Sequence, residues 1–431
     1  LDQRTCSVMS QSSAAQDFVA NVQAPQGAVA SLAQEGQEGM GALPVPTRKS
    51  ERWKYSPITA MLARPLGTAT APEGWPGDVE PNPVPGLDAY RIVLVNGHVV
   101  PEACDLPVAD GVVCMPWCQA VEEGHLADLD WSGYHRREWV GAVHAAHAQD
   151  GMFLHVAQGV TLDRPVLVHH HTTGDQVAAC PRHRIVVEDQ AHAEVVLWHS
   201  ASNGATGMVN GVLEACVGAG ARLGLDKVQH EEGEVFHLAH EHVTQGKDST
   251  FRIHSMTVKG HWVRNELNVV QEGQGAHTIM HGAYLPKDRE HVDNHTTMDH
   301  TVPNCTSSEL YKGILYDRST GVFNGKVFVR QEAQLTNAYQ QNANIVADAG
   351  ASINAKPELE IYADDVKCSH GCTVGQFDEE ALFYLKSRGI GDKAARALMV
   401  QAFIGDVLEG MGQEEVAQEV ETLLADRHGW S

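Results

Sequence analysis

The sequence predicts a mainly β protein in which a parallel β-helix lies between helical regions at its N-terminal and C-terminal ends. Residues 152–375 consist of short runs of alternating apolar and polar side chains, such as MFLHVAQGV, RPVLVHHH and AEVVLWHS, and alternation is typical of strands. Helical periodicity nearly vanishes over this span and returns after it. Polar or glycine-rich turns recur at intervals of roughly two to three dozen residues, the range of stacked supersecondary units. A sandwich would need hairpin turns throughout, so the span favours a β-helix.

Residues 1–89 are predicted to form an N-terminal helical region followed by a linker. The first 47 residues are rich in Ala, Gln, Ser and Gly and contain weak helical stretches such as AAQDFVANV, with too few large apolar residues for a core of their own. The segment RKSERWKYSPI mixes basic residues with Trp53 and Tyr55, which we interpret as an anchor to the body of the protein rather than an anion site. Five prolines between positions 72 and 85 exclude regular structure there.

Residues 90–151 are predicted to be a hairpin and a mixed α/β lead-in to the β-helix. YRIVLVNGHVV places Asn96-Gly97 between alternating residues, a strong signal for a two-residue hairpin turn. HRREWVGAVHAAHAQ follows as an amphipathic helix. Its His144 and His147 have a spacing that permits metal binding, but no acidic ligand is near, so packed or solvated histidines are expected.

Residues 376–431 are predicted to form three amphipathic helices, the first capped by Asp378 and ended by Gly389. The default role for these helices is to cover the end of the β-stack, which does not exclude that they also present a groove to a partner. Their apolar stripes contain Leu382, Leu385, Leu398, Phe403, Val407 and Leu408.

The composition excludes several classes of function. Lysine plus arginine total 31 against 55 acidic residues, which gives a net charge of −24, so nucleic acid is not an expected partner. No run approaches the ~20 apolar residues of a membrane helix, and no secretory signal is evident, so a cytoplasmic protein without membrane contact is expected. Nine irregularly spaced cysteines indicate reduced thiols rather than a disulfide framework.

The sequence contains none of the motifs that would indicate a nucleotide site or a hydrolase. GVFNGKV and GAGARLG lack the spacing of phosphate-binding loops, and neither a nucleophile elbow nor a zinc-protease helix is present. A β-helix without a nucleotide loop could be a polysaccharide lyase or hydrolase, which would use clustered carboxylates in an exposed groove. The candidate carboxylates for this alternative are Asp293, Asp299, Asp364 and Asp365.

The stretch ADDVKCSHGCTVG places Cys368, His370 and Cys372 at alternate positions. In a strand these three side chains share one face, and that face is the more apolar. Burial of both cysteines as small hydrophobic groups, with His370 hydrogen-bonded among them, is therefore favoured over a metal site on spacing alone. Three ligands in a row cannot enclose a tetrahedral ion, so a metal would need ligands from another strand or another chain.

Several segments resemble the SufB/SufD family, and its SufD branch in particular. These are NHTTMDHTVPNCTSSELYKGILYDRSTGVFNGKVFVRQ, KPELEIYADDVKCSHGCTVGQFDEEALFYLKSRGI, RKSERWKYSPI and RIVLVNGHVV. The resemblance implies a right-handed parallel β-helix between helical regions, and a non-catalytic scaffold role in the Suf iron–sulfur cluster assembly complex. It also implies pairing with a SufB-like subunit and docking of a SufC-like ABC ATPase on the C-terminal helices, with no nucleotide bound by this chain.

The resemblance further implies a transient iron–sulfur cluster at the interface with the SufB-like subunit. Carried over to this sequence, the cluster ligand is His370, with Cys368 beside it, whereas Cys372 departs from the family pattern. The ATPase-docking side chains would be Leu382, Leu385, Leu398, Phe403 and Val407. The sequence does not decide whether the chain forms a homodimer when alone or binds iron or flavin by itself. Nor does it identify the protein that accepts the cluster.

Overall fold

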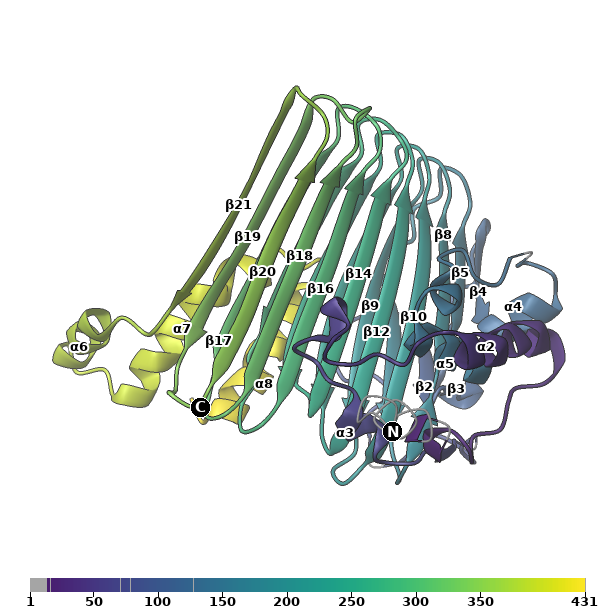
Figure 1. The fold of residues 1–431 in the computed structure, drawn as a ribbon, viewed down its shortest axis with the longest axis horizontal. Helices are drawn as coiled ribbons and strands as arrows, with labels where there is room; N and C mark the ends of the chain where they lie inside the picture. Colours follow the sequence, from purple (N-terminus) through teal and green to yellow (C-terminus); the bar gives the residue numbers. More distant parts are fainter. Residues whose placement is uncertain (1–13, 16, 70, 78, 127, 431) are drawn as a thin grey trace, which may run out of the picture.

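The computed structural model describes residues 14–430 except residues 16, 70, 78 and 127, and its largest part is a parallel β-helix (Figure 1). The fold predicted from the alternating runs is thus confirmed. Part of the predicted N-terminal segment, residues 1–13, lies outside the described residues. No helix in the described part of the chain is long and apolar enough to cross a membrane.

Two sheets form the walls of the β-helix, and from β8 onward successive strands alternate between them. The 11-stranded sheet contains β1 (Gly67–Thr68), β4 (Val112–Pro116), β5 (Met152–Val156), β7 (Val177–Ala179), β8 (Arg182–Val187), β10 (Thr206–Val217), β12 (Glu234–Gln245), β14 (Trp262–Gln271), β16 (His291–His300), β18 (Thr320–Val329) and β20 (Ser352–Ile361). The 10-stranded sheet contains β2 (Tyr90–Val95), β3 (His98–Val99), β6 (Val166–Thr172), β9 (His192–Ala201), β11 (Arg222–Glu231), β13 (Thr250–Lys259), β15 (His277–Tyr284), β17 (Thr306–Leu315), β19 (Thr336–Val346) and β21 (Val366–Gly375).

The interior of the β-helix combines an apolar core with a band of polar side chains. Inward residues such as Leu225, Val269 and Met298 belong to one continuous buried cluster. Between them, the buried Lys227 ammonium pairs with Glu241 at 2.5 Å and donates to the Asn265 side chain at 3.2 Å. Buried charges of this kind are tolerated only when they are paired and hydrogen-bonded.

The Asn96-Gly97 hairpin is confirmed. Asn96 and Gly97 both have positive φ angles, 50° and 84°, as a type I′ turn requires, and β2 pairs antiparallel with β3. Because β2 also pairs in parallel with β6, the two sheets begin before residue 152, where we placed the start of the β-helix.

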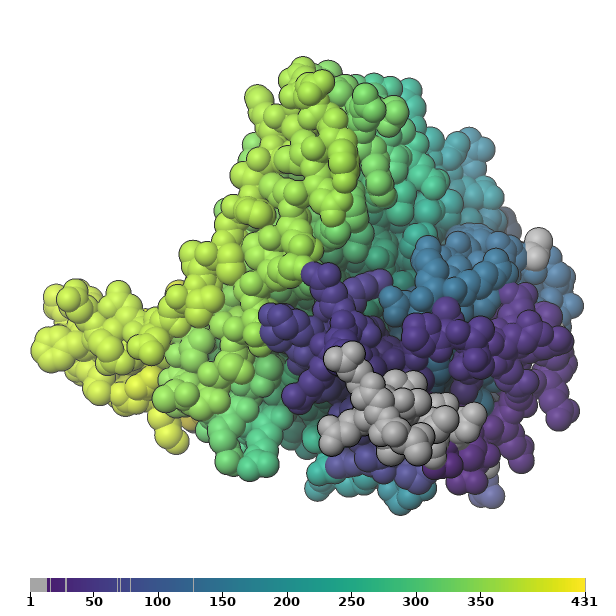
Figure 2. All heavy atoms as spheres, in the orientation of Figure 1, coloured from purple at the N-terminus to yellow at the C-terminus, as the bar shows by residue number. Residues whose placement is uncertain are grey.

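The N-terminal segment lies along the outer face of the 11-stranded sheet (Figure 2). It contains α2 (Ala30–Ala42) and α3 (Thr59–Leu62), and the lead-in adds α4 (Trp117–Glu122) and α5 (Trp139–His147), with 3₁₀ turns at Gly27–Val29, Glu51–Trp53, Pro101–Ala103 and Tyr134–Arg136. Trp53 is buried, and the Arg264 guanidinium lies 4.0 Å from its ring centroid. The anchoring interpretation of this segment therefore agrees with its packing.

Three helices follow the last strand, namely α6 (Glu379–Ser387), α7 (Asp392–Leu408) and α8 (Glu414–His428). The side chain of Asp378 accepts hydrogen bonds from the backbone N–H groups of Glu380 and Ala381, and Gly389 follows α6 with a φ of 87°, as predicted. The default interpretation that the helices cover the end of the stack is wrong. α7 contacts β15 and β17, and α8 contacts β13, so they cover the side of the 10-stranded sheet, while α6 projects away (Figure 1).

Candidate functional site

The C-terminal end of the β-helix is open. Within the described residues, β21 pairs only with β19, and β20 pairs only with β18. Each of these two strands therefore presents an edge of backbone N–H and C=O groups with no strand beyond it. Such edges are ready to pair with another chain.

The strand β21 carries the sequence-predicted site, and the expectation of burial is wrong for two of its three residues. His370 and Cys372 are exposed, whereas Cys368 is partly buried against the apolar core. All three share the inward face, but β21 is the last rung and nothing in the described chain covers that face. Alternation in one strand predicts which side chains share a face, not whether another layer lies above them.

A metal site at β21 would need ligands in addition to the side chains of this strand. Desolvation by neighbouring groups raises the pKa of the partly buried Cys368 thiol and of the more exposed Cys372 thiol, so both thiols favour their protonated form. No group of three His, Cys, Asp or Glu side chains in the described chain is arranged to hold a metal ion. A metal bound by His370 and a thiolate would therefore require ligands from outside this part of the chain.

A buried polar pair lies directly beneath His370. In the parallel ladder, Glu309 of β17 is opposite Gln340 of β19, which is opposite His370 of β21. Gln340 donates from its Nε2 to Glu309 Oε2 at 2.7 Å, and the Thr296 hydroxyl donates to the other carboxylate oxygen. Burial raises the pKa of Glu309 to about 7. Sequence reasoning missed both residues, although each is a polar residue at an inward position.

Large apolar side chains surround the open end. Leu335, Tyr339, Ile361, Tyr362 and Val374 are between 41% and 58% exposed. Four of them lie on β19, β20 and β21 or in the turn between β20 and β21, and Leu335 lies in the turn before β19. An exposed apolar group of this size beside unpaired strand edges is typical of a protein interface.

The predicted docking residues on the C-terminal helices differ in exposure. Leu382 and Val407 are buried in the cluster that joins the helices to the sheet, Leu385 and Phe403 are partly buried, and Leu398 is 46% exposed. The adjacent Phe383 and Tyr384 are 74% and 57% exposed, and our sequence reasoning did not select them. A surface for a partner would therefore consist of Leu398, Phe383 and Tyr384, with Leu382 and Val407 holding the helices from beneath.

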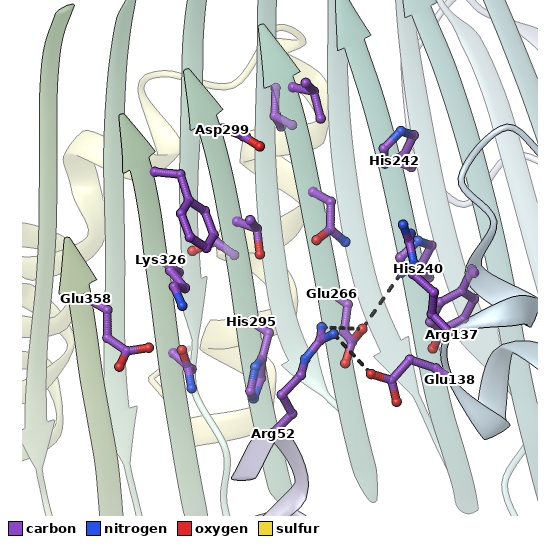
Figure 3. Close-up of a pocket in the computed structure, with 18 of the residues that line it drawn as sticks. Arg52, Arg137, Glu138, His240, His242, Glu266, His295, Asp299, Lys326 and Glu358 are labelled. Atoms are coloured by element: carbon purple, nitrogen blue, oxygen red, sulfur yellow. Dashed lines mark hydrogen bonds and ion pairs between the residues drawn. The ribbon is translucent and has the colours of Figure 1, made fainter. Parts of the chain in front are cut away.

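A cleft of about 670 Å³ opens on the outer face of the 11-stranded sheet (Figure 3). Its charges are largely paired with one another: Arg52 contacts Glu138 at 3.1 Å and Glu266 at 3.0 Å. Burial alone would raise the pKa of Glu266, but Arg52 and Arg264 hold it well below its usual range. Glu266 is thus held as a carboxylate and is unsuited to act as a general acid.

The four carboxylates of the carbohydrate-enzyme alternative do not form an acid and base pair. Asp293 is buried in an ion pair with Arg264, and Asp299 accepts two hydrogen bonds of 2.8 Å from the Arg330 guanidinium. Asp364 and Asp365 are exposed in the turn between β20 and β21. Glycoside hydrolysis needs one carboxyl group with a raised pKa close to a second carboxylate, and none of these groups is placed for that role.

Comparison with known proteins gives matches along almost the whole chain. Residues 170–403 match the family model described as SUF system FeS cluster assembly, SufBD core domain, and residues 23–168 match the SufBD protein N-terminal region. The chain is 30% identical to the iron–sulfur cluster assembly protein SufD of Escherichia coli over 393 residues, which cover 89% of each protein. It is also 30% identical to the SufBD family protein slr0076 of Synechocystis over 385 residues, 86% of this chain and 84% of the relative. The chloroplastic protein ABCI7 of Arabidopsis thaliana is 28% identical over 301 residues, 68% of this chain and 61% of that relative.

Proposed function

The chain belongs to the SufBD family of the SUF system for iron–sulfur cluster assembly, and on this premise we propose that it is a scaffold subunit rather than an enzyme. The single observation that carries the proposal is the open end of the β-helix, where an imidazole and a thiol lie beside unpaired strand edges. A scaffold for an oxygen-sensitive or labile product needs ligands at an interface more than it needs catalytic groups. The cluster is accordingly the cargo of this site.

The partner at the open end is a SufB-like subunit. The free edges of β20 and β21 supply backbone donors and acceptors for pairing. The exposed apolar group of Tyr339, Tyr362 and Val374 beside them supplies buried area. Because the edges are not specific to one sequence, a second copy of the same chain can use them when the SufB-like subunit is absent.

His370 and Cys368 contribute one half of the cluster site, and the SufB-like subunit contributes the other half. Thiolates suit iron, and a mixed set with a histidine binds a cluster less firmly than an all-thiolate set, which favours its release to an acceptor. The exposed position of His370 supports its role as a ligand. Cys372 is on the same face, 3.7 Å from the Asn342 side chain, and has no assigned role in the proposal.

A SufC-like ATPase docks on the C-terminal helices. The exposed Phe383, Tyr384 and Leu398 on α6 and α7 support this assignment. Because α7 and α8 pack on β13, β15 and β17, movement of the helices on ATP binding would reach the sheet that carries β21. ATP hydrolysis in the partner would then reshape the shared site.

The test is His370→Ala in a complex reconstituted with the SufB-like subunit and the ATPase. The complex should still assemble, because the exposed His370 side chain makes no large packing contribution, and cluster formation followed by visible absorbance should fall at least tenfold. The exposed His125, on the lead-in far from β21 in sequence, provides the matched variant His125→Ala, which should form clusters normally. A normal cluster yield from the His370→Ala complex would refute the assignment.

A further inference from the structure

The buried side-chain amide of Gln340 has a hydrogen-bond partner at its nitrogen but none at its oxygen within the described part of the chain. Its Nε2 donates to the Glu309 carboxylate at 2.7 Å, while its Oε1 has no hydrogen-bond partner in the described part of the chain. Gln340 and Glu309 are only 1% and 3% exposed. Several buried polar atoms of this β-helix have no partner, but Gln340 lies one rung from the open end, so a side chain of the last rung can supply the partner of its amide oxygen.

The orientation of this amide follows from Glu309. At pH 8, above its pKa of about 7, the Glu309 carboxylate can only accept hydrogen bonds, so the NH₂ end of Gln340 faces the preceding rung. The oxygen of the same planar amide is then turned away from Glu309. The rung on the other side of Gln340 is β21, where its ladder partner is His370.

The distance between rungs permits a contact between the two side chains. Neighbouring strands are about 4.7–4.9 Å apart, so stacked side chains on one face lie within reach of a hydrogen bond. The absence of a side chain at Gly325 leaves room for the Gln340 amide, because a Cβ at position 325 would lie only 2.3 Å from Gln340 Nε2. His370 is exposed and free to adopt the rotamer that brings a ring N–H to the amide oxygen.

We propose that Gln340, oriented by Glu309, is a positioning residue for His370: its amide oxygen accepts a hydrogen bond from one ring N–H and leaves the other ring nitrogen bare at the open end. This inference rests on the proposed function, in which His370 is a cluster ligand. Histidines that bind metals usually donate their second N–H to an oxygen, which fixes the tautomer and the ring orientation. Gln340 would supply that oxygen before the cluster arrives.

The test measures the tautomer of His370 in the isolated, iron-free chain at pH 8, by NMR of protein labelled with ¹⁵N in the histidine rings. The His370 signals are assigned as those that disappear in His370→Gln. We expect the native chain to favour one tautomer, and Gln340→Met, which keeps length but removes both polar ends, to change the tautomer ratio by about twofold to tenfold. The exposed Gln341 on the same strand provides the matched control Gln341→Met, which should leave the ratio unchanged.

A swapped pair provides a rescue. In Glu309→Gln with Gln340→Glu, the amide at position 309 donates to the carboxylate at position 340, whose second oxygen accepts from His370, so the native tautomer should return. Equal ratios in the native chain and Gln340→Met would overturn the proposal, as would a changed ratio that the swapped pair does not restore. Because no cluster is involved, this result is separate from that of His370→Ala in the complex, which tests the proposed function.

Discussion

Replacing Glu309 with glutamine should stabilise the isolated chain at pH 8 and change its stability much less at pH 5. Burial raises the pKa of Glu309 from the ordinary 4.5 to about 7, so the folded chain holds this proton over a range in which the unfolded chain has lost it. Stability therefore falls as pH rises from about 4.5 to about 7, and the full penalty is present above that range. The difference between the two pKa values corresponds to roughly 3 kcal/mol at pH 8.

Urea unfolding of the native chain and Glu309→Gln at pH 5, 6, 7 and 8 measures this effect. Other titrating groups are common to both proteins and cancel in the difference. The substitution also changes the hydrogen bonds to Thr296 and Gln340, which shifts the free energy of unfolding by an amount that depends little on pH. The free energy of unfolding of Glu309→Gln, relative to that of the native chain, should rise by about 2–3 kcal/mol between pH 5 and pH 8. Glu332 is exposed in a turn, so Glu332→Gln is the control, and a Glu309→Gln difference as flat as that of the control would refute the reasoning.

Three further predictions concern the regions that flank the β-helix, two on their packing and one on ATPase binding. Trp53→Ala should lower the free energy of unfolding by about 3–5 kcal/mol, because Trp53 is buried beneath Arg264; a loss below 1 kcal/mol in urea titration would argue against the anchor. Gly36→Ala should cost about 1–3 kcal/mol, because its Cβ would lie 2.2 Å from the backbone of α5 at Ala146, and an unchanged unfolding midpoint would be the contrary result. The pair Phe383→Ala and Tyr384→Ala should leave the midpoint unchanged and weaken ATPase binding at least tenfold in calorimetry, since both are exposed on α6; unaltered affinity would remove α6 from the docking surface.

Local patterns were sufficient to predict most of the fold. The alternating runs predict the strands because period-two alternation has a direct physical cause in the pleat. The hairpin at Asn96-Gly97 and the cap at Asp378 are likewise set by a few neighbouring residues. Each of these features is decided within about ten residues of sequence.

The helix α2 shows what local patterns miss. Its sequence ASLAQEGQEGMGA contains three glycines and looks too weakly apolar to pack. The glycines are what permit the packing, because Gly36 and Gly39 lie against the backbone and side chain of α5 residues such as Ala142. The packing of a helix that depends on close approach to a partner helix cannot be predicted from its own apolar content.

The site was only partly predictable for a related reason. The sequence places Cys368, His370 and Cys372 on one face of a strand, but burial depends on what covers that face, and the last rung has no cover. The pair of Glu309 and Gln340 beneath His370 arises from register between strands about 30 residues apart. Register across turns of a β-helix is a property of the assembled stack, which a single strand does not reveal.

Hydrogen exchange at the backbone amides of β21 gives the most direct test of the open end as a shared site. The exchange of residues 366–375 is measured in the chain at a concentration where it is monomeric and again in complex with the SufB-like subunit. The account predicts that amides on the free edge of β21 exchange rapidly in the monomer and at least tenfold more slowly in the complex. Equal exchange in the two states, with protection elsewhere on the surface, would contradict it.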